Sequence, residues 1–520
     1  MTALLYLLVF SFYLSFSFVV CFAVQENGYR YSFAYYKRYG AGEGYTALVC
    51  FLVSLSLAYI LHTSVWWGIG GVFAVGCYVL FRTFASRKKK RKLTPRLLRT
   101  ALLSCVLNVG IACFCYYLGL RISIHKIVTA LLFSFPVLAV YPCALLSICI
   151  LSPLERKIGN NYIAKAQKKL SVNSHAVRIA VTGSFGKTTV KNFLASFLRK
   201  TGSVFVTPNS YNTPQGIARA INERYAGEDF VIMEFGARRK GDIRELCQRY
   251  APKVGVITGV CEQHLSTFKT LTAVMQTKGE LYEEITKAHG DTFFSSDDKR
   301  ACELYEKCVG KKYYCGIARS DAPLAVEWIN TDALGNTVRL TCGNLSETIA
   351  LAVYGKHMVR DFALAACVAS TLGVSLTDIL LVAKDLRSPP HRMEVTRLPH
   401  CTVIDDSYNA NEVGAEEALN VLSRFSGRKV VVTPGLVEMG KRTESANCRL
   451  GEKIGEVCDF ALISARENAH AIEIGMKTAG FTQENYRVIG NGDSLANAVK
   501  EITKNGDTVL FLNDLPDGYK

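Results

Sequence analysis

The stretch Val177–Thr189, with the sequence VRIAVTGSFGKTT, decides the fold of the larger part of this 520-residue chain. It begins with an apolar run of the length of a buried strand, and a helical pattern follows it through Lys200. The glycine-bearing turn between them places backbone N–H groups at the start of a helix, where they attract an anion. Lys187 is expected to reach the β- and γ-phosphates of a nucleoside triphosphate, and the Thr188 hydroxyl to bind Mg²⁺.

This loop departs from the strict GxxxxGK[ST] spacing, because Val181 occupies the first glycine position. Strand, turn, Lys-Thr-Thr and helix nevertheless follow one another in the order that a phosphate-binding loop requires. We therefore predict that the chain binds a nucleoside triphosphate. The loop residues expected to contact it are Gly183, Ser184, Gly186, Lys187, Thr188 and Thr189.

Outward from the loop, short apolar runs alternate with helical stretches. Phe230–Phe235 and Val254–Thr258 have the length of buried strands, and such alternation predicts a parallel sheet covered on both faces. Residues 324–353 favour short antiparallel strands. A second series of strands and helices follows Gly355, with a proline-rich boundary near 388–400. The sequence thus predicts a central α/β domain with a phosphate loop and a parallel sheet, and then a Rossmann-like C-terminal α/β domain.

The N-terminal part differs in charge and hydropathy from the rest. Residues 1–170 hold 19 Lys and Arg against three Asp and Glu, which is nearly all of the net charge of +17. The remainder is close to neutral, so nucleic acid is not expected as a partner. Several segments are long and apolar enough to cross about 30 Å of hydrocarbon. We expect five such spans, with four as the alternative: 3–24, 45–62, 64–84, 99–120 and 127–151.

The orientation of this α-helical membrane region follows from its basic residues. Arg82–Arg99 carries nine Lys and Arg, and a further basic segment follows the last expected span. Both are expected in the cytoplasm, which predicts a multi-pass protein of the cytoplasmic membrane whose catalytic domains face the cytoplasm. The basic cluster serves either as a topology signal or as a site for anionic membrane lipids. The expected boundaries are a transmembrane region at 1–152, an amphipathic linker at 153–175, the central domain at 176–355 and the C-terminal domain at 356–520.

Further motifs follow the loop in a fixed order over residues 177–515. They are Tyr211–Pro214, Glu234–Ala237, His264–Leu265, Lys278–Glu280, Gly355–His357, His391–Glu394, Asp405–Asn411 and Glu438–Gly440. With the loop, this ordered set resembles the Mur ligases, which join a carboxylate to an amine at the expense of ATP. Within that family the resemblance is greatest to the ligases that add D-alanyl-D-alanine to a UDP-linked muramoyl tripeptide.

The resemblance implies a role for each motif. ATP would be converted to ADP through an acyl phosphate, with Lys187, His264 and Lys278 as the catalytic residues. Thr188 and Glu234 would hold one Mg²⁺, and His264 would hold a second together with a carbamoylated Lys278. Further contacts to the nucleotide would come from Asp361, Arg392 and Asp406. Contacts to the substrates would come from Asn209, Asn212, Thr213, Tyr408 and Asn409.

The chain also departs from the family pattern. Asp361 stands where the family has an adenine-contacting Asn, so either other groups bind adenine or another base is preferred. Membrane spans occupy the place of the domain that binds the UDP-linked substrate, which favours a lipid-linked cell-wall precursor as the acceptor, with D-Ala-D-Ala or an amino acid as the donor. Two alternatives are a ligase that makes poly-γ-glutamate or another capsule-type polymer, and a non-catalytic membrane scaffold that binds nucleotide.

Overall fold

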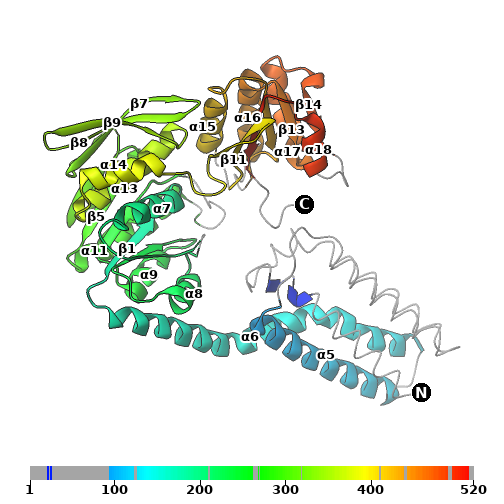
Figure 1. The fold of residues 1–520 in the computed structure, drawn as a ribbon. Helices are drawn as coiled ribbons and strands as arrows, with labels where there is room; N and C mark the ends of the chain where they lie inside the picture. Colours follow the sequence, from blue (N-terminus) through cyan, green and yellow to red (C-terminus); the bar gives the residue numbers. More distant parts are fainter. Residues whose placement is uncertain are drawn as a thin grey trace. The chain divides into compact units, whose positions relative to one another are not determined.

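The computed structural model divides into two compact units, Met1–Asn160 and Asn161–Lys520, which are described separately (Figure 1). The residues that the structure describes are 20–22, 24–25, 93–121, 126–208, 211–261, 268, 270–317, 319–408, 412–437, 442–489 and 495–513.

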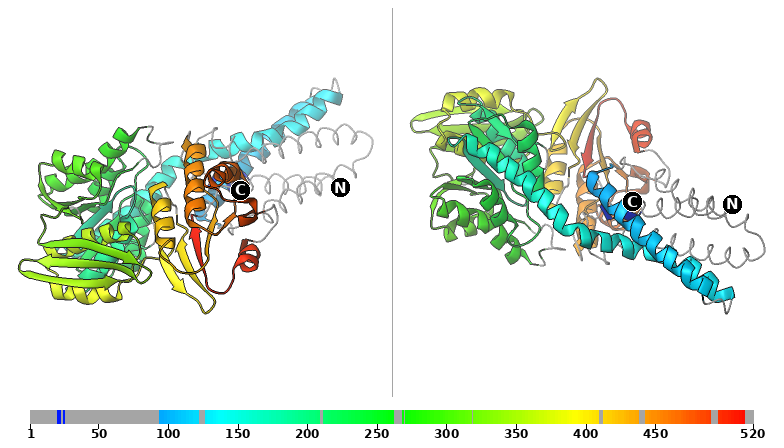
Figure 2. Two further views of the ribbon diagram at one scale, coloured as in Figure 1. Left: turned by 90° about the horizontal axis from the view of Figure 1, so that it is seen from above. Right: turned by 90° about the horizontal axis from the view of Figure 1, so that it is seen from below.

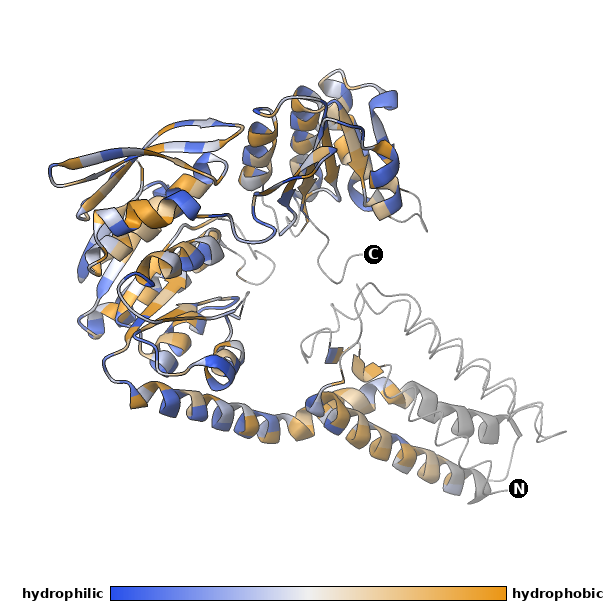
Figure 3. Cartoon of the chain, viewed as in Figure 1, coloured by the Kyte–Doolittle hydropathy of each residue, from blue (hydrophilic) through white to orange (hydrophobic). Residues whose placement is uncertain are grey.

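The first unit is helical in its described part. Helix α5 (Pro95–Arg121) and helix α6 (Lys126–Val172) contain stretches long and apolar enough to cross a membrane, at Pro95–Cys115 and Ala139–Val172. Figure 3 shows apolar residues over much of α5, whereas polar and apolar residues alternate in the last part of α6. Of the five expected spans, 3–24, 45–62 and 64–84 lie outside the described residues, apart from residues 20–22 and 24. The structure thus supports two candidate spans, and a multi-span region stays a prediction.

The last part of α6 belongs to the second unit, where it packs on the central domain. Ile163, Ala166 and Leu170 are buried in the same core as helix α8 (Pro214–Arg224). The Lys169 ammonium group lies at the C-terminal end of α8 and donates to the carbonyl oxygens of Asn222 and Tyr225, at 2.9 and 3.3 Å. A cation at this end of a helix is favourable because it meets unpaired carbonyl groups. The predicted linker is therefore a continuous helix through Val172.

The central domain is built on a six-stranded sheet of order β2-β3-β1-β4-β5-β6, in which every pair is parallel. Its strands are β1 (Val177–Thr182), β2 (Val204–Val206), β3 (Phe230–Glu234), β4 (Val254–Ile257), β5 (Asp291–Ser295) and β6 (Lys311–Cys315). The predicted parallel sheet is confirmed. Because β1 lies between β3 and β4, the loops that follow these three strands meet at one edge of the sheet.

Side chains that alternate along β1 explain why both faces of the sheet are covered. Ile179 and Val181 face a core shared with α7 (Lys187–Leu198), whereas Ala180 faces the core on the other side. Within the described residues, the helices on that other side are the last part of α6, α8, α9 (Asp242–Tyr250), α11 (Leu271–Lys287) and α12 (Lys299–Lys307). Two layers of helices therefore enclose β1, which is fully buried from Ile179 to Thr182 where it leads into the phosphate loop.

A three-stranded antiparallel sheet adds to the core around α7. Its strands are β7 (Leu324–Asp332), β8 (Gly335–Cys342) and β9 (Leu345–Leu351), as the sequence predicts. Helices α13 (Lys356–Thr371) and α14 (Leu376–Asp385) bury their apolar side chains in this same core. The expected boundary at residue 356 thus falls at the start of a helix that packs with the central domain, and the core of the C-terminal domain takes over after Leu386.

The C-terminal domain has a second six-stranded sheet, of order β10-β11-β15-β12-β13-β14. Figure 2 shows this domain, coloured from yellow to red, in two further views. Only the β10–β11 pair is antiparallel. The strands are β10 (Glu394–Arg397), β11 (Cys401–Asp406), β12 (Lys429–Thr433), β13 (Phe460–Ile463), β14 (Tyr486–Val488) and β15 (Asp507–Leu512). Helices α15 (Glu412–Leu422), α16 (Thr443–Val457) and α17 (Arg466–Thr478) share one core with this sheet, and α18 (Leu495–Ile502) packs in another. The predicted second α/β domain is confirmed.

Candidate nucleotide and metal site

The loop between β1 and α7 has the backbone conformation that its glycines permit. Gly186 lies in the left-handed region at φ 74°, directly before α7. At Gly183 a Cβ atom would lie 2.0 Å from Thr258 Oγ1, so no larger residue fits there. The loop is tied to the end of β4 by the Ser184 N–H, which donates to the Gly259 carbonyl oxygen at 2.7 Å. The two predicted loop glycines are therefore explained by close packing and by a positive φ.

Lys187 is the first residue of α7, and its side chain folds over the loop. Its Nζ donates to the carbonyl oxygens of Gly183 at 2.8 Å and Ser184 at 3.2 Å. Burial lowers the pKa of Lys187, although the nearby Glu234 carboxylate opposes this effect. An ammonium group held at the mouth of the loop is placed to meet phosphate oxygens there.

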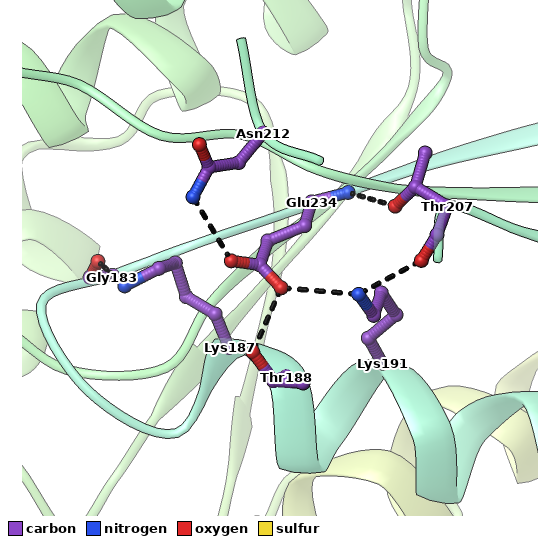
Figure 4. Close-up of polar contacts among 7 residues, drawn as sticks. All are labelled: Gly183, Lys187, Thr188, Lys191, Thr207, Asn212 and Glu234. Carbon is purple, nitrogen blue, oxygen red and sulfur yellow. Dashed lines mark hydrogen bonds and ion pairs between the residues drawn. The ribbon is translucent and has the colours of Figure 1, made fainter. Parts of the chain in front are cut away.

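Glu234, the last residue of β3, is the centre of the hydrogen-bond network in Figure 4. Its Oε2 accepts from Thr188 Oγ1 at 2.9 Å and from Lys191 Nζ at 3.1 Å, and its Oε1 accepts from Asn212 Nδ2 at 3.2 Å. The residue is 1% exposed. Burial alone would raise the pKa of Glu234, but the charges of Lys191 and Lys187 outweigh this and lower it. The carboxylate is thus ionised and fixed in one orientation.

The sequence predicted Thr188, Glu234 and Asn212 at this site but not Lys191. Lys191 comes one helical turn after Thr188 on α7, and its side chain is 1% exposed. Its Nζ also donates to the Thr207 carbonyl oxygen at 2.9 Å. A signal was present in the sequence, because Lys191 shares a helix face with the apolar residues Leu194 and Leu198 at spacings of three and seven.

Thr188 and Glu234 fit a divalent cation. Their hydroxyl and carboxylate oxygens are hard donors of the kind that Mg²⁺ prefers, and they meet at the start of the loop helix. The second predicted set is only partly described, because His264 lies outside the described residues. Among the residues that the structure describes, no group of three His, Cys, Asp or Glu side chains comes together in a metal-ligating cluster.

Lys278 lies on α11 and reaches the same edge of the sheet. Lys278 is 4% exposed, and its Nζ donates to Thr182 Oγ1 at 3.4 Å. Burial, together with the positive charge of Lys187, lowers the pKa of Lys278 to about 7. Its neighbour Glu280 has a structural task, since it accepts from the backbone N–H groups of Gly241 and Arg244 at the start of α9.

Asp361, predicted as a nucleotide contact, lies beneath the loop. A Cβ atom at Gly186 would come 2.5 Å from Asp361 Oδ1, so the carboxylate packs directly against that glycine. Thr189 hydrogen-bonds the carboxylate, and burial raises the pKa of Asp361 to about 7 against the opposing charges of His357 and Arg392. Asp361 therefore supports the phosphate loop from inside the central domain.

Arg392 lies just before β10, and Asp406 is the last residue of β11 in the C-terminal sheet. The Arg392 guanidinium lies 4.4 Å from the centre of the Tyr408 ring. Arg392 lowers the pKa of Lys187, so its charge acts on the loop. Asp406 Oδ1 accepts from the Met393 N–H at 3.1 Å, and burial raises the pKa of Asp406. The charge of Arg392 therefore reaches the phosphate loop, and Asp406 holds the backbone next to Arg392. That the two residues contact the nucleotide stays a prediction.

The predicted substrate residues are only partly described. Asn209 and Asn409 lie outside the described residues. Asn212 packs against Gly236, at which a Cβ atom would lie 2.7 Å from Asn212 Cγ. Thr213 is the N-cap of α8, and its hydroxyl accepts from the Gly216 N–H at 3.2 Å, which gives it a structural task that the sequence analysis missed.

The fold and this site define a phosphate-loop α/β protein with a buried acidic residue beside the loop. Residues 181–369 match the Mur ligase middle domain, and residues 391–513 match the Mur ligase glutamate ligase domain. The two matched segments together make up more than half of the chain. The chain belongs to the Mur ligase family.

Individual relatives have one name in common. The chain is 24% identical over 299 residues to the UDP-N-acetylmuramoyl-tripeptide–D-alanyl-D-alanine ligase of Escherichia coli, covering 56% of this chain and 65% of that one. It is 31% identical over 276 residues to the ligase of the same name from Mycobacterium leprae, covering 50% and 53%. The chain therefore spans somewhat more than half of the length of these relatives.

Solved structures agree with this assignment. The ligase MurF from Thermotoga maritima in complex with ADP superposes with a TM-score of 0.59 at 25% identity, covering 68% of this chain and 80% of that one. MurF from Acinetobacter baumannii gives a TM-score of 0.60 at 23% identity, covering 68% and 77%, and so shares the fold.

The contact between Gly186 and Asp361 yields a first prediction. In Gly186→Ala the new methyl group meets the Asp361 carboxylate at a backbone conformation that alanine rarely adopts, so the loop must shift. We expect ATP affinity to fall about tenfold or more, which corresponds to about 1.4 kcal/mol. Isothermal titration calorimetry measures this. Gly480→Ala is the matched control, because Gly480 has a similar φ of 79° with no atom within 4 Å of its Cβ position. Unchanged ATP affinity in Gly186→Ala would contradict the assigned loop geometry.

Proposed function

We propose that the chain is a membrane-anchored, ATP- and Mg²⁺-dependent ligase of the MurF type. In this proposal it forms an amide bond between the carboxylate of a peptidoglycan precursor and an amino acid or a dipeptide such as D-Ala-D-Ala. The observation that carries the proposal is the Thr188–Glu234 contact beside the phosphate loop, at the edge of the sheet where Lys187, Lys278 and Asn212 also meet. The names of the relatives support the choice of substrates.

The reaction begins when the substrate carboxylate attacks the γ-phosphorus of ATP, which releases ADP and gives an acyl phosphate. The amine then attacks the acyl carbon, and phosphate leaves from the tetrahedral intermediate. The loop N–H groups and Lys187 hold the phosphates in line for the first step. Arg392, which is charged at any working pH, stabilises the charge on the transferred phosphoryl group.

Thr188 and Glu234 would hold Mg²⁺, which offsets the repulsion between the triphosphate and the incoming carboxylate. Lys278 is proposed to be carbamoylated, which would convert its amine into a carboxylate able to hold a second cation together with His264. Reaction with CO₂ needs a neutral amine. The burial that lowers the pKa of Lys278 to about 7 supplies a neutral amine near physiological pH.

Membrane anchoring is also part of the proposal. It is supported by the apolar stretches Pro95–Cys115 and Ala139–Val172. The last part of α6 adds exposed apolar side chains at Leu154, Ile158 and Tyr162, near the basic residues Lys157 and Lys165. Such a face suits the surface of a membrane with anionic lipids. An anchored enzyme would meet a lipid-linked acceptor in the plane of the membrane.

Phosphate release by the detergent-purified chain tests the ligase proposal. With ATP, Mg²⁺ and D-Ala-D-Ala, we expect release only when a muropeptide acceptor is present, and at least tenfold faster for the lipid-linked form than for the UDP-linked form. Lys187→Ala should lose this activity, because the ammonium group that is proposed to bind the phosphates is then absent. Lys200→Ala, which changes an exposed lysine just beyond the same helix, is the control.

The outcomes separate the alternatives. Equal turnover of both muropeptides would remove the lipid-linked acceptor but keep the ligase. Release with glutamate alone, together with polymer growth, would replace the proposal by a polyglutamate ligase. Nucleotide binding without release in the presence of any acceptor would support a scaffold.

Carbamoylation of Lys278 gives a separate prediction. In the presence of ¹³C-bicarbonate we expect a carbamate signal by NMR, and depletion of CO₂ should lower the ligase rate several-fold. Lys278→Ala should lose the signal. Lys287→Ala is the matched control, because Lys287 lies on the same helix but its side chain is 66% exposed and pairs with Glu284. A rate that does not depend on CO₂, with no carbamate signal, would contradict the assignment.

A further inference from the structure

Lys191 is a buried cation that the reaction scheme does not use. Its Nζ lies 3.1 Å from Glu234 Oε2, and both side chains are almost fully buried, at 1% and 2% exposed. Burying an ion pair removes two charges from water, and apolar residues of similar size are often at least as stabilising. Stability alone therefore explains the pair poorly. Its position beside the phosphate loop suggests a role in nucleotide or metal binding.

The geometry makes Lys191 a competitor for the same carboxylate. Oε2 of Glu234 receives both the Thr188 hydroxyl and the Lys191 ammonium group, as Figure 4 shows. The ammonium group cannot move away easily, because it also donates to the Thr207 carbonyl oxygen at 2.9 Å. Thr207 in turn accepts from the Glu234 N–H through its hydroxyl at 3.1 Å. Lys191, Glu234 and Thr207, the residue that follows β2, are thus joined in one hydrogen-bond network.

We propose that Lys191 is a built-in counter-ion of Glu234 that keeps Mg²⁺ from binding tightly until the nucleotide arrives. This rests on the proposed role of Glu234 as a Mg²⁺ ligand. Two cations that share one carboxylate in a poorly solvated site repel each other strongly. Lys191 and Asn212 hold the Glu234 carboxylate in one orientation, which favours Mg²⁺ binding. In this proposal the repulsion between Lys191 and Mg²⁺ is the larger of the two effects. The negative charge of the bound triphosphate then offsets this repulsion and makes Mg²⁺ binding favourable. Metal and nucleotide therefore bind together.

The test uses Mg²⁺ alone, with no nucleotide and no acceptor, at constant ionic strength. Mg²⁺ is titrated into the purified full-length chain while the melting temperature is followed, and binding is measured by calorimetry. In Lys191→Met the buried carboxylate has lost its counter-ion. We therefore expect Mg²⁺ to bind at least tenfold more tightly than in the unmodified chain, and to raise the melting temperature where it has little effect on the unmodified chain. Lys191→Arg keeps the charge and should behave as the unmodified chain does.

Two further variants make the result decisive. The double variant Glu234→Gln with Lys191→Met removes both charges and should not respond to Mg²⁺. Lys200→Met, at an exposed lysine, controls for the loss of a positive charge. If Lys191→Met does not fold, the same titration on Lys191→Gln decides. A Mg²⁺ affinity in Lys191→Met, or in Lys191→Gln, equal to that of the unmodified chain would overturn the proposal. This holds whether or not the chain proves to be a ligase, because no substrate takes part in the measurement.

Discussion

One buried carboxylate at the end of a central strand organises this site. Glu234 receives hydrogen bonds from three side chains, those of Thr188, Lys191 and Asn212, which come from α7 and from the segment before α8. An unpaired charge at such a depth would be very costly, so each of these groups has to be in place. The position of the phosphate loop relative to β3 follows from this requirement.

The sheet supplies the frame for that carboxylate. Val181 of β1 is in register with Glu234 of β3, so the strand that leads into the loop and the strand that carries the acidic residue end together. The Gly259 carbonyl oxygen after β4 holds the loop from the other side. Asp361 on α13 fills the space beneath Gly186. The candidate nucleotide site thus lies where three neighbouring parallel strands end, and α13, which shares a core with the loop helix α7, supports it.

The sequence predicted the strands and the loop between β1 and α7 correctly, because buried parallel strands and glycine turns leave strong local patterns. It failed where the decisive property is tertiary. Lysine on a helix is usually solvated, and although Leu194 and Leu198 share its helix face, the tertiary packing is what establishes that Lys191 is buried. Thr213 caps a helix, which depends on where α8 begins. The division of cores after Leu386 could not be predicted, since α13 and α14 form part of the second α/β series along the chain and yet pack with the first sheet.

The central claim is that Glu234 holds the metal that accompanies the nucleotide. The most direct test compares ATP affinity with and without Mg²⁺ in the unmodified chain and in Glu234→Gln, by calorimetry. The account predicts that Mg²⁺ strengthens ATP binding at least tenfold in the unmodified chain. In the variant this gain should be lost, while binding of metal-free ATP through the loop and Lys187 persists. A variant that keeps the full gain from Mg²⁺ would show that the metal is held by other groups and would contradict the account.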